Sequence, residues 1–167
     1  MIDTFGRRID YLRISITDRC NMRCRYCMPD GISSVGHGDV LHYEEIMEIC
    51  RAALRVGITK FKVTGGEPFV RKGAVGFIRE LRSLPGVESV TVTTNGWLLA
   101  QVVPELRRIG VNGVNISLDS LNRVQYRAIT GVDALPEVLQ ALRQCAASGL
   151  PTKINAVLLA ETKEQLA

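Results

Sequence analysis

Polar and apolar residues alternate in five short stretches of the chain, and longer segments with a helical pattern lie between them. Alternation with a period of two is typical of a β-strand, whereas apolar residues three or four positions apart indicate an amphipathic helix. The strand-like stretches are residues 11–17, 60–64, 89–94, 113–119 and 152–159. The helical patterns are residues 43–56, 74–84, 98–109 and 133–148.

Glycine and proline mark the expected ends of the helices. Gly57, Gly110 and Gly149 each follow a helical pattern directly, as is common at helix C-termini. Pro104 either kinks the third helix or begins a fresh one. Strands that alternate with helices form parallel sheets with right-handed crossovers. We therefore predict an α/β fold with a parallel sheet of about five βα units.

Each predicted strand has one polar side, because its hydroxyl, amide and cationic residues share one parity. This polar set is Arg13, Ser15, Thr17, Lys62, Thr64, Thr91, Thr93, Asn95, Asn115, Ser117, Asp119, Lys153 and Asn155. Parallel strands covered on both faces are nearly all apolar, so the pattern favours a curved sheet, or partial barrel, whose hollow side is a binding cavity. The alternative is a flat sheet with one exposed face. The cations Arg13, Lys62 and Lys153 indicate an anionic ligand.

The composition is that of an ordinary globular protein. Residues 1–167 are predicted to form one domain, large enough for a hydrophobic core. No apolar segment of an export signal is present, and the longest apolar run is too short to span a bilayer. The five cysteines lack disulfide-type spacing, which indicates reduced thiols and predicts a cytoplasmic location. Cys50 and Cys145 lie on apolar helical faces and are predicted to be core residues.

The net charge is +4, and basic residues are frequent at the start of the chain. Arginine occupies positions Arg7, Arg8, Arg13, Arg19, Arg23 and Arg25. Such a group favours cysteine thiolates nearby and steers an acidic ligand or electron donor. Aromatic residues make up 5% of the chain and do not interleave with the basic ones, which argues against nucleic-acid binding.

Cys20, Cys24 and Cys27 stand at C-x3-C-x2-C spacing just after the first predicted strand. Three thiolates on one tight loop can hold three irons of a [4Fe-4S] cluster and leave the fourth iron open to bind another molecule. The alternative is a structural zinc site with His37 or His42 as fourth ligand, although zinc motifs usually come as C-x2-C pairs.

Polar or glycine-containing turns follow the second, third and fourth predicted strands. They are Thr64-Gly65-Gly66-Glu67-Pro68, Thr93-Thr94-Asn95-Gly96 and Ser117-Leu118-Asp119-Ser120. Gly65 and Gly66 let the backbone approach a ligand closely, and Glu67 offers an acceptor for an ammonium group. The carboxyl ends of parallel strands share one rim, where the active sites of βα barrels lie. We therefore expect these turns and the cysteine loop to form one site.

The cysteine spacing resembles the signature of the radical S-adenosylmethionine (SAM) superfamily. The likeness is greatest to those members that convert GTP to the cyclic pterin precursor of the molybdenum cofactor. It is carried by Phe5-Gly6-Arg7-Arg8, Thr17-Asp18-Arg19-Cys20, Tyr26-Cys27-Met28-Pro29, the three turns above, Asn115-Ile116, Ile129-Thr130 and Lys153-Ile154-Asn155. It covers essentially the whole chain.

The resemblance implies a partial (β/α) barrel of the radical SAM type, with a [4Fe-4S] cluster and SAM as cofactors. Cys20, Cys24 and Cys27 would be the metal ligands and the catalytic residues. Tyr26, Gly65, Gly66, Glu67 and Ser117 would bind SAM, and Arg13, Lys62, Thr93 and Lys153 would bind GTP. In the implied reaction, reductive cleavage of SAM yields a radical that abstracts hydrogen from GTP, which rearranges to 3′,8-cyclo-GTP.

The chain departs from the family pattern in two respects. Lys62 replaces the usual arginine, which keeps the charge but loses the planar fork that grips phosphate. The chain also matches only the N-terminal part of the pattern, so a C-terminal domain with a second cluster is expected to be absent. The sheet edge left open would be covered by that missing half or by a second copy of the chain. The implied partners are GTP as substrate and an acidic electron donor such as a flavodoxin or ferredoxin.

Two other functions fit the residues. One is a radical SAM enzyme that acts on another substrate, such as a peptide. The other is a non-catalytic iron–sulfur binding or electron-transfer fragment. Cleavage of SAM, and its dependence on GTP, distinguish the three.

Overall fold

The computed structural model describes residues 2–27, 40–160, 162 and 163. Within them, the strands are β1 (Tyr11–Ser15), β2 (Lys60–Thr64), β3 (Ser89–Thr94), β4 (Gly113–Ser117) and β5 (Thr152–Asn155). The α-helices are α1 (Tyr43–Arg55), α2 (Ala74–Ser83), α3 (Val103–Ile109), α4 (Arg123–Thr130) and α5 (Leu135–Ser148). Short 3-10 turns at Pro68–Val70 and Leu99–Gln101 precede α2 and α3.

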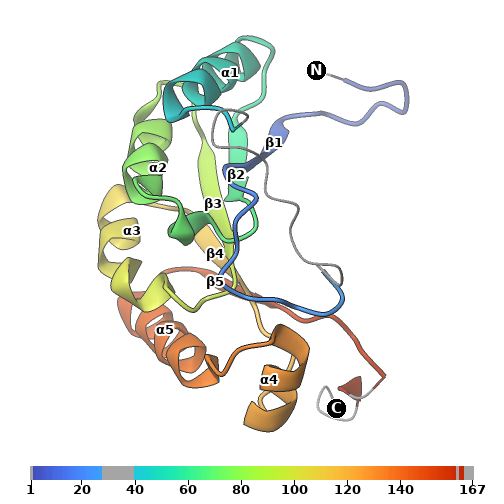
Figure 1. The fold of residues 1–167 in the computed structure, drawn as a ribbon. Helices are drawn as coiled ribbons and strands as arrows, with labels where there is room; N and C mark the ends of the chain where they lie inside the picture. Colours follow the sequence, from blue (N-terminus) through green and yellow to red (C-terminus); the bar gives the residue numbers. More distant parts are fainter. Residues whose placement is uncertain (1, 28–39, 161, 164–167) are drawn as a thin grey trace.

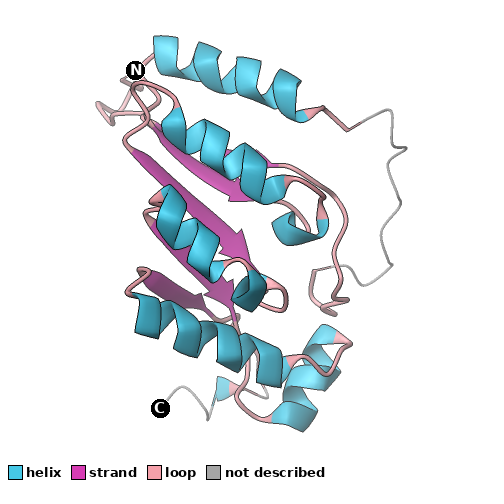
Figure 2. Ribbon diagram, turned by 90° about the vertical axis from the view of Figure 1, so that its left-hand side faces the viewer, coloured by secondary structure: helices cyan, strands magenta, loops and turns pink. Residues whose placement is uncertain are grey.

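The five strands form one parallel sheet in the order of the sequence, β1-β2-β3-β4-β5. Helices α1, α2, α3 and α5 stand side by side over one face of this sheet (Figures 1 and 2). Each helix connects two neighbouring parallel strands, which is the βα crossover that the alternating pattern predicts. The protein is therefore a partial (β/α) barrel, and the predicted fold class is confirmed.

The hydrophobic core lies between the sheet and the row of helices. The apolar parity of the three central strands supplies Phe61, Val63, Val90, Val92, Val114 and Ile116, each at most 1% exposed. The apolar faces of the helices pack on them with residues such as Ile78, Leu106 and Val138, which are also buried. Burial of this apolar surface is the main stabilising contribution to the fold.

The opposite parity forms a polar face whose residues stand in register across the sheet. Arg13 on β1 pairs with Lys62 on β2, and Lys62 pairs in turn with Thr91 on β3. A second row begins at Thr93 on β3 and continues through Asn115 on β4 to Lys153 on β5. The two rows bring the three predicted cations Arg13, Lys62 and Lys153 onto one face, as the parity of the sequence indicates.

The structure decides between the two alternatives at Pro104 and adds one helix that the sequence pattern did not predict. Pro104 begins a fresh helix, because it occupies the first turn of α3, where its missing N–H costs nothing. Helix α4 has no counterpart among the predicted helices. The start of this helix is marked by the Asn122 side chain, which accepts from two backbone N–H groups. Its end is marked by Gly131, which has a positive φ. The helix is only eight residues long, so too few apolar positions repeat along it for the sequence pattern to reveal it. Among the described residues, no helix combines the length and apolar character that a bilayer-crossing segment needs.

Strands β1 and β5 are the two edges of the sheet. On β5 the apolar residue Ile154 is 56% exposed, whereas its neighbour in register on β4, Ile116, is fully buried. Exposed apolar residues continue at Val157 and Leu158. The described residues therefore leave the β5 edge and its apolar side uncovered.

We expect Phe61→Ala to lower the free energy of unfolding by about 3–5 kcal/mol, because it leaves a cavity under the helices. Phe5, which is 82% exposed in the N-terminal segment, supplies the matched control. Its replacement by alanine is expected to change stability by less than about 0.5 kcal/mol. Chemical denaturation monitored by circular dichroism measures both, and equal effects would contradict this description of the core.

Candidate functional site

The cysteine loop, residues 20–27, follows β1 and is held from one side by the end of α4. The Arg23 N–H donates to the Thr130 carbonyl at 2.8 Å, and the Arg25 N–H donates to the Ile129 carbonyl at 3.0 Å. The last carbonyls of a helix have no partner inside the helix, so they are free to accept from another segment. The helix that the sequence pattern did not reveal thus supports the cysteine loop.

The Gly65-Gly66 turn after β2 supports the loop from the other side. The Gly66 N–H donates to the Thr17 carbonyl and the Glu67 N–H to the Arg19 carbonyl, both at 2.8 Å. A Cβ at Gly65 would stand 2.6 Å from the Thr17 carbonyl oxygen, and one at Gly66 would stand 2.4 Å from that of Arg19. Both glycines are therefore required by the close approach of the chain that leads into the cysteine loop, besides lining the cavity described below.

The Glu67 carboxylate is turned into the protein interior. Its side chain is 0% exposed, and both carboxylate oxygens accept from the Thr94 hydroxyl at 2.9 and 3.0 Å. One oxygen also accepts from the Phe69 N–H, and the other from the Asn95 N–H at 2.7 Å. The expectation that its carboxylate accepts from an ammonium group of a ligand is therefore corrected, because the carboxylate is committed to β3 and its own turn.

The cysteine loop and the carboxyl ends of the strands enclose one cavity of about 660 Å³, within the size range of small-molecule sites. The predicted site residues that line it are Arg13, Cys20, Cys24, Tyr26, Cys27, Gly65, Gly66, Thr93 and Ser117. The predicted convergence of the cysteine loop with the strand ends is thus present. The lining also includes Asn95 and Asn155, to which the sequence assigned no ligand.

Lys62 and Lys153 line a different cavity, of about 420 Å³, on the same polar face. It lies toward the amino ends of the strands, where Tyr11 and Lys60 also contribute to its wall. The Lys62 ammonium stands 5.8 Å from the centre of the Tyr11 ring, within the range of a cation–π contact. The four residues expected to bind GTP are therefore divided between two cavities. Arg13, in the cavity of the thiols, is paired in register with Lys62, in the other cavity, so the two cavities adjoin along the polar face.

Burial dominates the electrostatics of the cysteine loop. It raises the pKa of the Cys20 thiol, and it raises the pKa of Cys24 to about 11 together with the nearby Asp119 carboxylate. The pKa of Tyr26 is also raised, first by burial and then by its hydrogen bond to Asp119, where the hydroxyl donates to Oδ2 at 2.6 Å. The other oxygen of Asp119 accepts from the Val157 N–H at 2.8 Å. Asp119 thereby joins the cysteine loop to the segment after β5.

The donor set of this cavity fits an iron–sulfur cluster better than a single metal ion. Cys20, Cys24 and Cys27 are free thiols around one cavity, and thiolates are the usual ligands of such clusters. Among the described residues, no three of the His, Cys, Asp and Glu side chains converge closely enough to hold one ion. His42 precedes α1 and lines another pocket, and His37 lies outside the described residues. The zinc alternative is therefore unsupported within the described part of the chain.

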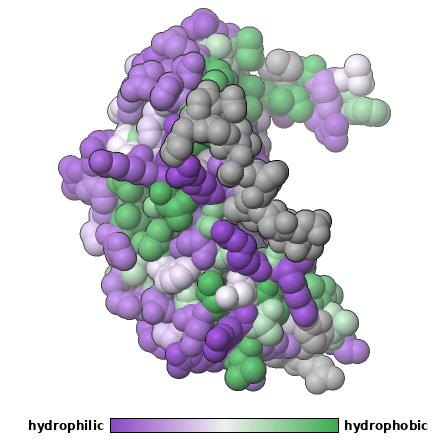
Figure 3. Space-filling view, in the orientation of Figure 1, coloured by the Kyte–Doolittle hydropathy of each residue, from purple (hydrophilic) through white to green (hydrophobic). Residues whose placement is uncertain are grey.

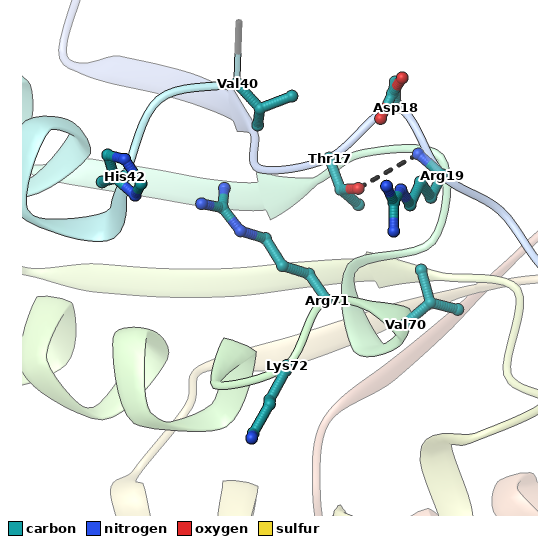
Figure 4. A pocket seen from close by; sticks show the side chains of 8 residues that line it. All are labelled: Thr17, Asp18, Arg19, Val40, His42, Val70, Arg71 and Lys72. Carbon is teal, nitrogen blue, oxygen red and sulfur yellow. Dashed lines mark hydrogen bonds between the residues drawn. The ribbon is translucent and has the colours of Figure 1, made fainter. Parts of the chain in front are cut away.

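That other pocket, of about 320 Å³, lies beside the chain that enters the cysteine loop (Figure 4). The Arg71 side chain reaches toward β1, whereas Lys72 points the other way. The Arg71 guanidinium donates to the carbonyls of Ile16 and Leu41 and stacks 4.1 Å over the Tyr43 ring. Arg71 therefore ties the turn after β2 to neighbouring backbone.

Comparison with protein families agrees with this geometry. The model of the radical SAM superfamily matches residues 14–167. The chain is 49% identical over 161 residues to a protein of Geobacter sulfurreducens named GTP 3′,8-cyclase, and 48% identical over 161 residues to one of Peptoclostridium acidaminophilum with the same name. The aligned segment is 95% of this chain but 49% and 50% of those proteins, so the chain spans about half the length of the curated relatives it matches.

Solved structures show the same fold at lower sequence identity. The structure named native anSMEcpe with bound AdoMet superposes with a TM-score of 0.76 at 19% identity, over 93% of this chain and 45% of that one. The crystal structure of Streptococcus suis SuiB superposes with a TM-score of 0.74 at 21% identity, over 94% of this chain and 36% of that one. At these identities the likeness establishes the partial barrel and nothing finer.

We expect Gly66→Ala to destabilise the protein by about 1–3 kcal/mol, because the new Cβ would force the turn away from the Arg19 carbonyl. Gly76 in α2 is the matched control, since a Cβ there meets no atom within 4 Å. Gly76→Ala is expected to stabilise the helix by about 0.5–1 kcal/mol. Thermal melts of both variants test this, and a neutral Gly66→Ala would show that the close contact is not required.

Proposed function

The chain belongs to the radical SAM superfamily, and we propose that residues 1–167 form the SAM-binding core domain of a GTP 3′,8-cyclase. The observation that carries the proposal is the single cavity in which the three cysteines meet the Gly65-Gly66 turn at the carboxyl ends of the strands. The sequence identity to the two cyclases supports the choice of reaction, and it extends over 95% of the chain.

Cys20, Cys24 and Cys27 would hold three irons of a [4Fe-4S] cluster and leave the fourth iron for SAM. When bound, the cluster and SAM together supply the carbon radical that abstracts a hydrogen atom from the substrate. The chain's own part is to orient the ligands and to exclude water. The loop that carries the thiols is suited to this part, because α4 and the Gly65-Gly66 turn fix its backbone on both sides.

Tyr26, Gly65, Gly66 and Ser117 are proposed to contact SAM, because they line the cavity together with the thiols. Ser117 offers a hydroxyl at the end of β4, and the two glycines present backbone without side chains in the way. The Tyr26 hydroxyl is already engaged by Asp119, so its ring has a defined position. Glu67 would support these residues from the interior, because its carboxylate accepts hydrogen bonds from Thr94 and Asn95 at the end of β3.

GTP is proposed to lie along the polar face with its triphosphate near the cations. Lys62 and Lys153 lie toward the amino ends of the strands, and the thiols lie at the carboxyl ends. A substrate with one anionic end would therefore be oriented with its other end toward the cysteine loop. Arg13 and Thr93, which line the cavity of the thiols, would bind the part of the nucleotide between these ends.

Two kinds of partner follow from the surface. Arg23 and Arg25 in the cysteine loop are exposed, and they would attract an acidic electron donor such as a flavodoxin or ferredoxin. The uncovered β5 edge, with Ile154 and Leu158 exposed, would be covered by a further segment of a longer chain or by a second copy of this one.

Reconstitution of the cluster without oxygen, followed by reduction and addition of SAM with and without GTP, tests the proposed reaction. We expect 5′-deoxyadenosine to form and to depend on GTP, with little cyclised product because the chain spans half of its relatives' length. Cys24→Ser is expected to abolish cleavage of SAM, whereas Cys145→Ala, at a buried cysteine outside the loop, should retain it.

The outcomes separate the alternatives. Cleavage that ignores GTP would favour a radical SAM enzyme with another substrate, such as a peptide. Absence of cleavage in a chain that holds its cluster would favour a non-catalytic iron–sulfur fragment.

We expect Lys62→Ala and Lys153→Ala each to weaken GTP binding about fivefold, because Lys62 is partly exposed and Lys153 is exposed, so solvent screens both charges. Lys62→Arg should strengthen binding, since a guanidinium binds phosphate with two parallel hydrogen bonds. Lys72→Ala removes the same charge away from the polar face and serves as control. Equilibrium titration with GTP at two salt concentrations measures the effects, and an equal loss in the control would point to general electrostatics.

A further inference from the structure

Asn95, at the carboxyl end of β3, connects the interior of the sheet to the cysteine loop. It lines the cavity of the thiols, and the sequence pattern marks it as a polar residue of the turn after β3 without giving it a role. Its side chain contacts Cys20 directly, and its backbone N–H is connected through Glu67 to Arg19, the residue before Cys20.

The orientation of the Asn95 amide is determined by its hydrogen bonds. The side-chain oxygen accepts from the Trp97 N–H at 3.0 Å, so the nitrogen must face the other way. That nitrogen donates to the Asn21 side-chain oxygen at 2.7 Å and lies 3.8 Å from the Cys20 sulfur, as a weak N–H···S donor. A flipped amide would place its NH2 group against the Trp97 N–H and its oxygen against the sulfur, which is unfavourable at both ends.

The position of Asn95 is fixed by the buried carboxylate of Glu67. The Asn95 N–H donates to Glu67 at 2.7 Å, and the Glu67 N–H donates to the carbonyl of Arg19, the residue before Cys20. The contacts close a ring: Cys20 is bonded to Arg19, Arg19 accepts from Glu67, Glu67 accepts from Asn95, and Asn95 donates back to Cys20. A closed ring of this kind leaves the sulfur few alternative positions.

The Cys20 sulfur also accepts from the Met22 N–H at 3.4 Å, so two N–H groups point at it. Hydrogen bonds to the sulfur ligands of an iron–sulfur cluster are one of the means by which a protein sets its reduction potential. N–H donors withdraw electron density from the thiolate and favour the reduced cluster, which carries the greater negative charge.

We propose that Asn95 is a positioning residue whose amide orients the Cys20 sulfur and raises the reduction potential of the cluster bound there. The inference rests on the proposed function, because it requires that the cysteine loop holds a cluster. It gives a role to two residues of the turn after β3. Asn95 contacts the cluster ligand Cys20, and the Thr94 hydroxyl and the Asn95 N–H hold the buried Glu67 carboxylate.

The test compares Asn95→Asp with Asn122→Asp in the reconstituted full chain. Aspartate at position 95 keeps the acceptor for the Trp97 N–H, removes the N–H donor and adds one negative charge. Asn122 also accepts backbone N–H groups through its side chain, at the end of α4 away from the cysteine loop, so its replacement adds the same charge and keeps the helix cap. Midpoint potentials measured by electron paramagnetic resonance during redox titration are the readout, with iron content and melting temperature measured in parallel.

We expect Asn95→Asp to lower the ratio of reduced to oxidised cluster about tenfold at a fixed potential, which corresponds to about 59 mV for one electron. Asn122→Asp should leave the potential of the wild type unchanged. Loss of iron from Asn95→Asp at an unchanged melting temperature would also support the positioning role. If Asn95→Asp does not fold, Asn95→Ser carries the same measurement, because serine retains an acceptor for the turn and removes the amide.

Equal potentials and iron contents in the wild type and both Asn95 variants would overturn the inference while leaving the proposed function intact. A wild-type chain that assembles no cluster at all would instead overturn the proposed function. The two failures are therefore distinguishable.

Discussion

The chain that enters the cysteine loop lies against the backbone of the Gly65-Gly66 turn, and the arrangement of the site depends on this contact. The carbonyls of Thr17 and Arg19 accept from the turn at distances that leave no room for a Cβ. On its far side the same loop is paired with the last carbonyls of α4. The thiols are thus held between the second and fourth βα units, although they follow the first strand. A loop that is already ordered in this way loses less conformational entropy when a ligand binds.

Because the strands are parallel and in regular register, the two ends of the polar face carry different residues. The thiols and the glycine turn meet at the carboxyl ends of the strands, whereas Lys62 and Lys153 lie toward the amino ends. Arg13 stands opposite Lys62 and thereby joins the two regions. An elongated ligand with one anionic end suits such a face in one direction only, because the charge of the face is concentrated away from the thiols.

Two carboxylates next to the site accept hydrogen bonds from the protein itself. Glu67 is buried and accepts from β3, and Asp119 accepts from Tyr26 and from the Val157 N–H. A buried carboxylate is stable only when its oxygens accept enough hydrogen bonds, and here the donors come from segments distant in the sequence. Neighbouring residues alone cannot reveal such donors, which is why the sequence indicated Glu67 as a ligand group.

The sequence by itself determined the fold class, the polar parity of the strands and the set of candidate site residues. These are local properties, because alternation, glycine at helix ends and the C-x3-C-x2-C spacing each occupy a few consecutive residues. The tertiary structure decided which of them meet. It placed Lys62 and Lys153 in a cavity separate from that of the thiols and turned Glu67 inward. It also brought the short helix α4 against the cysteine loop. Such contacts join residues far apart in the chain, and their distances depend on the packing of whole βα units, which no short stretch of sequence contains.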